Sequence, residues 1–156
     1  MHRRYILQMG ALAALWPGLR PALAGEGSFA VTLSEAEWRA RLTPLQYAVL
    51  REEETERAGT SPLDKEKREG IYHCAGCDLA AYSSAHKYDS GTGWPSFWQA
   101  LKGAVGTKED NSLFATRTEV HCARCGGHFG HVFDDGPEPT GKRHCINGAA
   151  LLFRPA

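Results

Sequence analysis

Two Cys-x-x-Cys pairs constrain this chain more than any other feature of its sequence. They are Cys74 with Cys77 and Cys122 with Cys125, and 44 residues separate one pair from the other. Small residues, which are Ala75 and Gly76 in the first pair and Ala123, Gly126 and Gly127 around the second, let backbone N–H groups approach the sulfur atoms. Four thiolates in tetrahedral geometry suit zinc and form a closed, structural site. The separation exceeds that of a simple zinc ribbon, so we expect a sheet to bring the two pairs together.

Two other interpretations of these cysteines stay open at this stage. In an exported protein the pairs could form disulfides, and one pair alone could be a redox motif of the thioredoxin type. Two similar pairs in one small domain favour a metal, because a redox site needs only one pair. His73 and His121 each precede a pair. We interpret both as residues of the sheet or its surroundings rather than as ligands.

The length and charge of the chain limit its organisation and its partners. Its 156 residues, 42% of them apolar, are enough for one domain with a real core. The formal net charge is zero. Without residues 1–24, which hold three arginines and no acidic residue, 15 basic and 18 acidic residues remain. Nucleic acid is therefore not an expected partner.

Residues 1–24 have the three parts of an export signal. His2-Arg3-Arg4 is a short positive start, Ile6 to Leu15 is apolar, and Ala22-Leu23-Ala24 is a small-x-small pattern before a cleavage point. The apolar stretch is too short for a spanning helix with proper flanks. An uncleaved anchor or a buried N-terminal helix is the alternative interpretation.

The adjacent Arg3 and Arg4 also resemble a twin-arginine signal, although His2 stands where Ser or Thr is familiar. We expect an exported, periplasmic protein that has no stable membrane association once the signal is removed. Residues 25–30 are predicted to be a linker, and residues 31–156 the functional domain.

Two short helices are predicted at the N-terminal side of this domain. Ser34 with Glu37, and Thr43 with Gln46, are capping boxes, in which a side chain at each end of the first turn bonds a backbone N–H. Pro44 fits the first position of the second helix. Gly59 is the predicted end of that helix.

Short strands separated by glycine-rich turns follow after Gly70, which indicates a mostly β, antiparallel domain. The predicted strands are Ile71–His73, Leu79–Tyr82, Ala104–Thr107, Leu113–His121, Val132–Phe133 and Arg143–Phe153.

Cys145 is the one cysteine without a near partner in the sequence. On a strand, Arg143 and Asn147 share its face. A fixed cation beside a thiol favours the thiolate, which is the nucleophilic form. A buried and inert cysteine in a C-terminal strand is the alternative.

Four motifs in order make the chain similar to a known family. They are Lys87-Tyr88-Asp89-Ser90-Gly91-Thr92-Gly93-Trp94-Pro95-Ser96-Phe97, the two cysteine pairs, His128-Phe129-Gly130-His131-Val132-Phe133-Asp134-Asp135-Gly136-Pro137 and Arg143-His144-Cys145-Ile146-Asn147. From about Trp38 to Phe153 the chain resembles the B-type methionine sulfoxide reductases, which act on the R epimer at sulfur. The resemblance implies two antiparallel sheets, a structural zinc ion and Cys145 as nucleophile.

The side chains can be assigned roles in such a reaction. A sulfoxide becomes a good electrophile once its oxygen is protonated, and His128 and His131, oriented by Asp135, are the expected proton donors. Arg143 is expected to stabilise the thiolate, and Asn147 to hold the thiolate or the substrate. The resemblance makes Trp94 the aromatic wall against the substrate methyl group, and Phe97 and Phe133 are further candidates for it. A structural role in the core is the alternative for His131 and for these aromatic residues.

Thr92 stands where many relatives carry a resolving cysteine. With four cysteines on zinc, none remains for an internal disulfide with Cys145. We therefore expect an external reductant, either a thioredoxin-like protein or a small thiol. The expected substrate is methionine-R-sulfoxide in oxidised proteins or as the free amino acid. The competing hypotheses are a non-catalytic, zinc-stabilised β module that binds a protein, and a thiol-disulfide oxidoreductase that uses a Cys-x-x-Cys pair.

Overall fold

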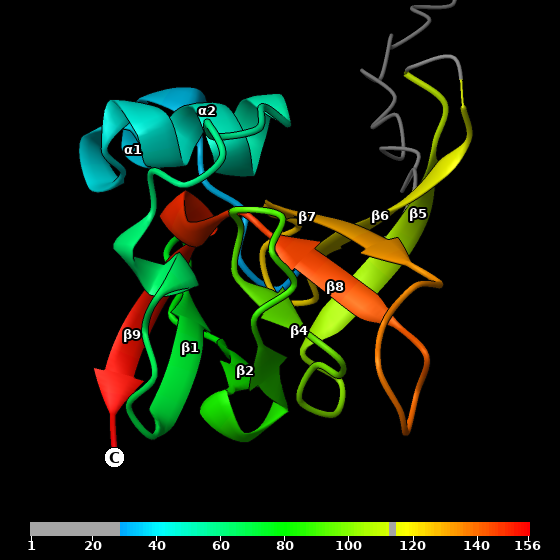
Figure 1. Ribbon diagram of the computed structural model, residues 1–156. Helices are drawn as coiled ribbons and strands as arrows, with labels where there is room; N and C mark the ends of the chain where they lie inside the picture. Colours follow the sequence, from blue (N-terminus) through cyan, green and yellow to red (C-terminus); the bar gives the residue numbers. More distant parts are fainter. Residues whose placement is uncertain (1–28, 113–114) are drawn as a thin grey trace, which may run out of the picture.

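Two short helices pack beside two antiparallel sheets in the computed structural model, which describes residues 29–112 and 115–156 (Figure 1). The mostly β class with N-terminal helices is confirmed. The predicted export signal and most of the predicted linker lie outside the described residues. Phe29 and Ala30, at the end of that linker, are described, and the Phe29 ring packs edge-on against His121.

The helices are α1 (Glu35–Arg41) and α2 (Pro44–Glu52). Both predicted capping boxes are present, with Pro44 in the first turn of α2. The prediction that α2 ends at Gly59 is wrong. Glu53 adopts a left-handed backbone conformation with φ of 58° and ends the helix there. The chain continues from there in a loop that contains Thr55 and Glu56.

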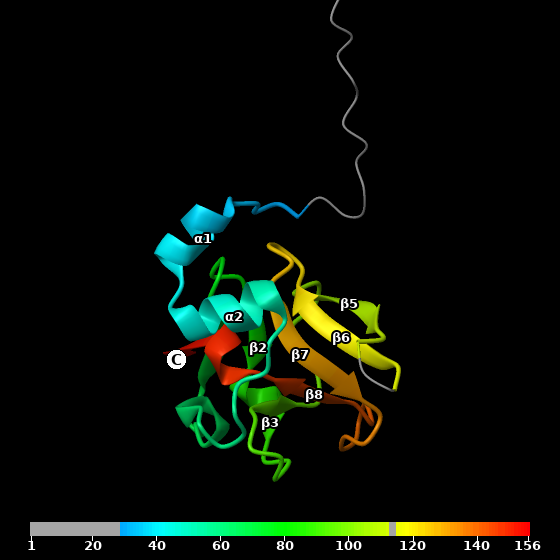
Figure 2. The same cartoon turned by 90° about the horizontal axis from the view of Figure 1, so that it is seen from above.

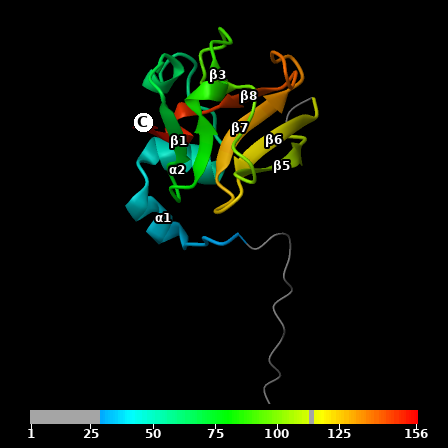
Figure 3. The same ribbon diagram turned by 90° about the horizontal axis from the view of Figure 1, so that it is seen from below.

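The smaller sheet has three strands in the order β2-β1-β9, and the larger has six in the order β3-β4-β8-β7-β6-β5. From below, β8, β7, β6 and β5 follow one another across the larger sheet (Figure 3). The strands are β1 (Gly70–Cys74), β2 (Ala80–Ser83), β3 (Lys87–Tyr88), β4 (Ser96–Phe97), β5 (Val105–Asp110), β6 (Arg117–Cys122), β7 (His128–Phe133), β8 (Arg143–Ile146) and β9 (Leu151–Pro155). Three single turns of 3-10 helix complete the fold: η1 (Pro62–Asp64), η2 (Ser84–His86) and η3 (Gly148–Ala150).

Predicted and observed strands differ most at the C-terminal end. The predicted strand 143–153 is divided into β8 and β9, which belong to different sheets. Between them, the buried carboxylate of Glu56 accepts hydrogen bonds from the backbone N–H groups of Gly148 at 2.6 Å and Ala149 at 2.9 Å. These bonds satisfy two backbone N–H groups of the turn in which the chain leaves one sheet and enters the other. The sequence patterns also missed β3 and β4, which are two residues each.

The strand predicted over 113–121 is observed as β6, which begins only at Arg117. Residues 113 and 114 lie outside the described part of the chain.

The core lies between the sheets and under α2. Tyr82 stacks on Phe97 with ring centroids 4.4 Å apart, and Tyr72 meets Phe97 edge-on; all three residues are fully buried. From above, α2 lies beside β7 and η3, with which it is in contact (Figure 2). Within the described residues, no helix combines the length and the apolar character needed to cross a bilayer.

Candidate functional site

The two cysteine pairs meet in one buried cluster, where the ends of β1 and β6 are followed by tight turns. All four Sγ atoms lie within 4.8 Å of one another. The Sγ atoms of Cys74 and Cys125 are 3.7 Å apart, and those of Cys77 and Cys122 are 3.5 Å apart. Four sulfur atoms about 2.3 Å from a zinc ion form a tetrahedron with edges of roughly 3.8 Å. The geometry therefore fits a metal ion.

The disulfide interpretation is wrong for these cysteines. A disulfide needs sulfur atoms about 2.0 Å apart, and all five cysteines are free thiols. Hydrogen bonds from Cys125 and Cys74, together with backbone N–H groups of Cys125 and Arg124, hold the pKa of Cys122 well below its usual value. Such N–H groups favour thiolates and hence metal binding. His73 and His121 are not part of the cluster.

Cys145 lies apart from this cluster, at a cavity of about 140 Å³. Its strand, β8, runs between β4 and β7, with His131 directly across from Cys145 on β7. Five of the predicted residues line the cavity together: Trp94, His131, Phe133, Cys145 and Asn147. Thr55, Arg117 and Gly130 also line it. Gly130 belongs to a quoted motif but had no predicted role, and Thr55 and Arg117 lie outside the motifs.

Burial dominates the electrostatics of the lone thiol. It raises the pKa of Cys145, because a thiolate is poorly solvated there. The Thr92 hydroxyl, 3.9 Å from Sγ, and the Arg143 guanidinium act in the opposite direction but are outweighed. Arg143 lowers the pKa of Cys145, which is the predicted direction, but burial has the larger effect and the net shift is upward.

Arg143 is itself neutralised by a carboxylate. Its Nε and Nη2 donate to the two oxygens of Asp135, each at 2.8 Å, and its guanidinium lies over the Phe133 ring. The predicted role of Asp135 in orienting the histidines is thus wrong. Its two oxygens bind Arg143, since Phe133 pairs with Arg143 and the chain just beyond β7 runs beside that side chain.

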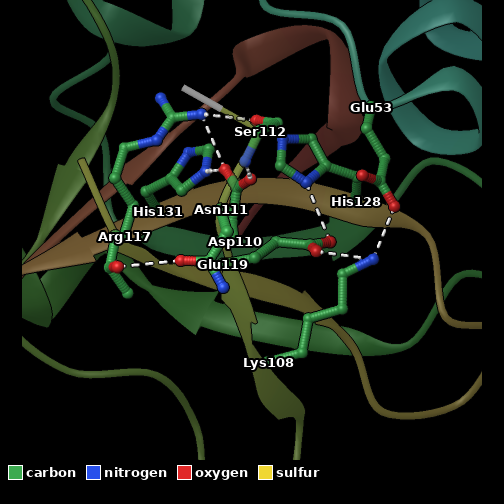
Figure 4. A network of polar contacts seen from close by, with 10 residues as sticks. Glu53, Lys108, Asp110, Asn111, Ser112, Arg117, Glu119, His128 and His131 are labelled. Atoms are coloured by element: carbon green, nitrogen blue, oxygen red, sulfur yellow. Dashed lines mark hydrogen bonds and ion pairs between the residues drawn. The ribbon is translucent and has the colours of Figure 1, made fainter. Parts of the chain in front are cut away.

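Other carboxylates contact the two histidines (Figure 4). His131 Nε2 lies 2.7 Å from Asp110 Oδ2, and His128 Nδ1 lies 2.9 Å from Glu119 Oε1. Burial lowers the pKa of both imidazoles. His128 is buried and does not line the cavity, whereas His131 does. The prediction that both histidines face the substrate is therefore supported only for His131.

A loop segment around Glu56 holds two of the predicted residues. Asn147 accepts a hydrogen bond from the Glu56 backbone N–H at 2.9 Å and donates one to the Phe129 carbonyl at 3.0 Å. Trp94 Nε1 donates to the Glu56 carbonyl at 3.1 Å. These two bonds give Asn147 a structural role at the cavity, and its expected hold on the thiolate or the substrate stays a prediction.

Phe97 and Phe133 have different surroundings. Phe97 is fully buried in the aromatic core and does not line the cavity, so its predicted contact with substrate is wrong. Phe133 lines the cavity beside Arg143.

Four cysteines placed where they could hold a metal ion, and a fifth at a cavity of its own, are typical of a thiol-dependent oxidoreductase with a separate structural centre. A thiol-disulfide oxidoreductase that uses one Cys-x-x-Cys pair would not require the two pairs to lie together. Their clustering therefore argues against that hypothesis.

Comparisons with known proteins give the same class. Residues 42–155 match the model of the SelR domain. The chain is 50% identical over 126 residues to the peptide methionine sulfoxide reductase MsrB of Agrobacterium fabrum, covering 80% of this chain and 93% of that protein. Identity to the MsrB of Leptospira interrogans is 49% over 128 residues, which cover 81% of this chain and 98% of that protein. Identity to the MsrB of Methanosarcina barkeri is 52% over 126 residues, which cover 80% of this chain and 89% of that protein.

The chain therefore belongs to the MsrB family, and it is a peptide methionine sulfoxide reductase. The hypothesis of a non-catalytic β module is not favoured.

Proposed function

We propose that Cys145 reduces methionine-R-sulfoxide by direct attack of its sulfur on the sulfoxide sulfur. The observation that carries this proposal is the placement of Cys145, His131 and Trp94 around one cavity. The cavity supplies a nucleophile, a group that can exchange a proton near neutral pH and an aromatic face for the methyl group.

The reaction balances with these groups alone. The Cys145 thiol gives up its proton, its sulfur attacks the substrate, and the sulfoxide oxygen takes up a proton. The bond between the two sulfur atoms then breaks as the hydroxyl group passes from the substrate sulfur to the Cys145 sulfur, which leaves methionine and a sulfenic acid. Methionine sulfur gains two electrons and the cysteine sulfur loses two. Arg143 and the Thr92 hydroxyl favour the thiolate as it forms, which offsets part of the cost of burial.

Trp94 is proposed to select the substrate methyl group. Its indole N–H is fixed to the Glu56 carbonyl, so the position of the ring is set before substrate binds. The electron-rich face of an indole favours the positive charge that develops on the substrate sulfur. A cavity of about 140 Å³ takes up one side chain, which suits a methionine sulfoxide exposed on a protein as well as the free amino acid.

The sulfenic acid is proposed to be reduced by an external thiol. A thiol converts it to a mixed disulfide and water, and a second thiol releases the Cys145 thiol and a disulfide. A thioredoxin-like protein supplies both thiols at once, and a small thiol can supply them in turn. Thr92 occupies the position beside Cys145, and the other four cysteines are gathered in the buried cluster.

We propose zinc as the ion of the four-cysteine cluster, held by Cys74, Cys77, Cys122 and Cys125. Four thiolate ligands leave no open position, so the ion supports the fold and does not touch substrate. The N-terminal pattern supports a further proposal, export to the periplasm and removal of residues 1–24. In that compartment the reductant must be an extracytoplasmic thiol donor.

The test is an assay of both sulfoxide epimers with dithiothreitol as reductant. Wild-type protein is expected to reduce the R epimer alone. Cys145→Ser is expected to lose this activity and keep its metal content, since Cys145 lies outside the cluster. Reduction of the S epimer, or turnover by Cys145→Ser, would refute the proposal.

A further inference from the structure

We infer that Asp110 is the positioning residue for His131, and that Nδ1 of His131 is the atom that carries the proton between Cys145 and the sulfoxide oxygen. The inference rests on the proposed function of Cys145. It adds a residue from β5 that no motif of the sequence singled out, and it assigns the proton transfer to one atom.

Asp110 ends β5 and lies directly across from Arg117, the first residue of β6. Its Oδ2 is 2.6 Å from Nη2 of Arg117 and 2.7 Å from Nε2 of His131, while its Oδ1 accepts the backbone N–H of Ser112 at 2.9 Å. Figure 4 shows these contacts converging on one carboxylate. Hydrogen bonds from Ser112, His131 and Arg117 keep the pKa of Asp110 far below its usual value. The Asp110 side chain is therefore a carboxylate anion at neutral pH.

An anionic carboxylate can only accept hydrogen bonds, so Nε2 of His131 must carry its proton. The neutral ring is then the Nε2–H tautomer, and Nδ1 holds a lone pair. Nδ1 is left as the atom that can gain and lose a proton during the reaction. His131 lines the cavity opposite Cys145, where that exchange is needed.

Both groups between which the proton moves are neutral at rest. Burial raises the pKa of the Cys145 thiol and lowers that of His131, so a neutral thiol faces a neutral imidazole. As Cys145 attacks, Nδ1 accepts the thiol proton and passes it to the sulfoxide oxygen. The ring returns to the neutral Nε2–H form, and no proton is taken from solvent. Asp110 stabilises the imidazolium that exists between these two events.

A second pair of the same kind lies beside the first and does not reach the cavity. Glu119 contacts His128 at 2.9 Å and Lys108 at 2.8 Å, and Lys108 also contacts Glu53. Glu119 lies across from His131 on β6, and the imidazoles of His128 and His131 are 5.4 Å apart. The ionisable groups around His131 are therefore Asp110, Arg117, Glu119, His128 and Cys145.

The first measurement uses wild-type, metal-loaded protein and does not depend on activity. Nitrogen NMR of 15N-histidine-labelled protein, with the His131 signals identified by their loss in His131→Gln, reports which ring nitrogen is protonated. We expect Nε2 to stay protonated at all pH values and Nδ1 to titrate. A neutral ring protonated on Nδ1 would overturn the inference.

The second measurement compares Asp110→Asn with a matched control. The asparagine can turn its amide N–H groups toward Nε2 and so stabilise the wrong tautomer. We expect kcat to fall about 10- to 100-fold with little change in KM, and an Nδ1–H signal to appear. Asp110→Glu, which keeps the carboxylate, should recover part of the loss.

Asp78→Asn is the control. Asp78 contacts an arginine and a histidine as Asp110 does, with Arg154 at 2.6 Å and His73 at 3.4 Å, but it lies away from the cavity. The Asp78→Asn substitution should leave kcat unchanged.

Full activity and an unchanged tautomer in Asp110→Asn would refute the inference while leaving the proposed function intact. If Asp110→Asn does not fold, the tautomer of His131 in the wild-type protein alone tests the inference. Wild-type protein inactive on methionine sulfoxide would refute the proposed function, and the tautomer would still be readable.

Discussion

The side-chain oxygen of Asn147 accepts a hydrogen bond from the backbone N–H of Glu56 at 2.9 Å, although the two lie 91 positions apart in the chain. Asn147 and Cys145 both line the cavity, and the Glu56 carbonyl accepts a hydrogen bond from the Trp94 indole. The Asn147 amide thus fixes the chain just after β8 to the loop whose Glu56 carbonyl binds the Trp94 indole.

Asn147→Ala is expected to disturb both stability and activity. It leaves the buried N–H of Glu56 without its partner, which costs about 1–3 kcal/mol of unfolding free energy. We also expect kcat/KM to fall, because Trp94 loses a fixed support. Denaturant unfolding and epimer assays check both effects. Asn111→Ala, in the exposed turn after β5, is the control and should change the unfolding free energy by less than about 0.5 kcal/mol. An unchanged Asn147→Ala protein would contradict this role.

Thr92→Cys should change how the enzyme is recycled. The Thr92 hydroxyl lies 3.9 Å from Cys145 Sγ, so a small movement brings a thiol at that position within bonding distance. After oxidation by substrate, this variant should form a disulfide between positions 92 and 145, and the wild-type protein should not. Peptide mass spectrometry distinguishes them. A substrate-induced internal disulfide of Cys145 in wild-type protein would disprove external reduction of the sulfenic acid.

The reactivity of Cys145 should rise steeply with pH. Burial raises its pKa, so the thiol form prevails at pH 7, and each pH unit below that pKa increases the thiolate about tenfold. Alkylation by iodoacetamide, followed on the Cys145 peptide, should show no plateau below pH 8. Thr92→Val removes a contact that lowers the pKa, so alkylation should be slower at equal pH. A plateau near pH 6 would instead indicate a thiolate at rest.

Removal of the proposed zinc ion should unfold the domain rather than stop only the chemistry. A structural zinc ion contributes on the order of 10 kcal/mol to the folding of small domains. Cys122→Ser should lose the metal and a substantial part of this stability, while Cys145→Ser keeps both. Metal analysis and thermal unfolding check the contrast. Loss of metal in Cys145→Ser would mean that Cys145 is a ligand.

Local patterns predicted much of the fold. The capping boxes at Ser34 and Thr43 involve residues three apart, and each Cys-x-x-Cys pair is one turn, so neighbouring residues alone determine them. The division between β8 and β9 depends instead on the Glu56 carboxylate, which reaches the backbone of residues 148 and 149 from a distant loop. No pattern within 143–153 contains that information.

The candidate site shows the same limit. Cys145, Trp94 and His131 were predicted from motifs, and the structure brings them to one cavity. The carboxylate partner of His131 was assigned to Asp135, four residues away in sequence, and is Asp110. Only the pairing of β5, β6 and β7 brings Asp110 to the histidine, and that register is set by long-range contacts.

The central claim is that Cys145 is the only sulfur that reacts, and a single turnover without reductant tests it most directly. Wild-type protein with excess methionine-R-sulfoxide should release one equivalent of methionine. It should then carry a dimedone-reactive sulfenic acid on Cys145 and on none of Cys74, Cys77, Cys122 and Cys125. Oxidation of a cluster cysteine, or release of methionine with Cys145 still a thiol, would contradict the account.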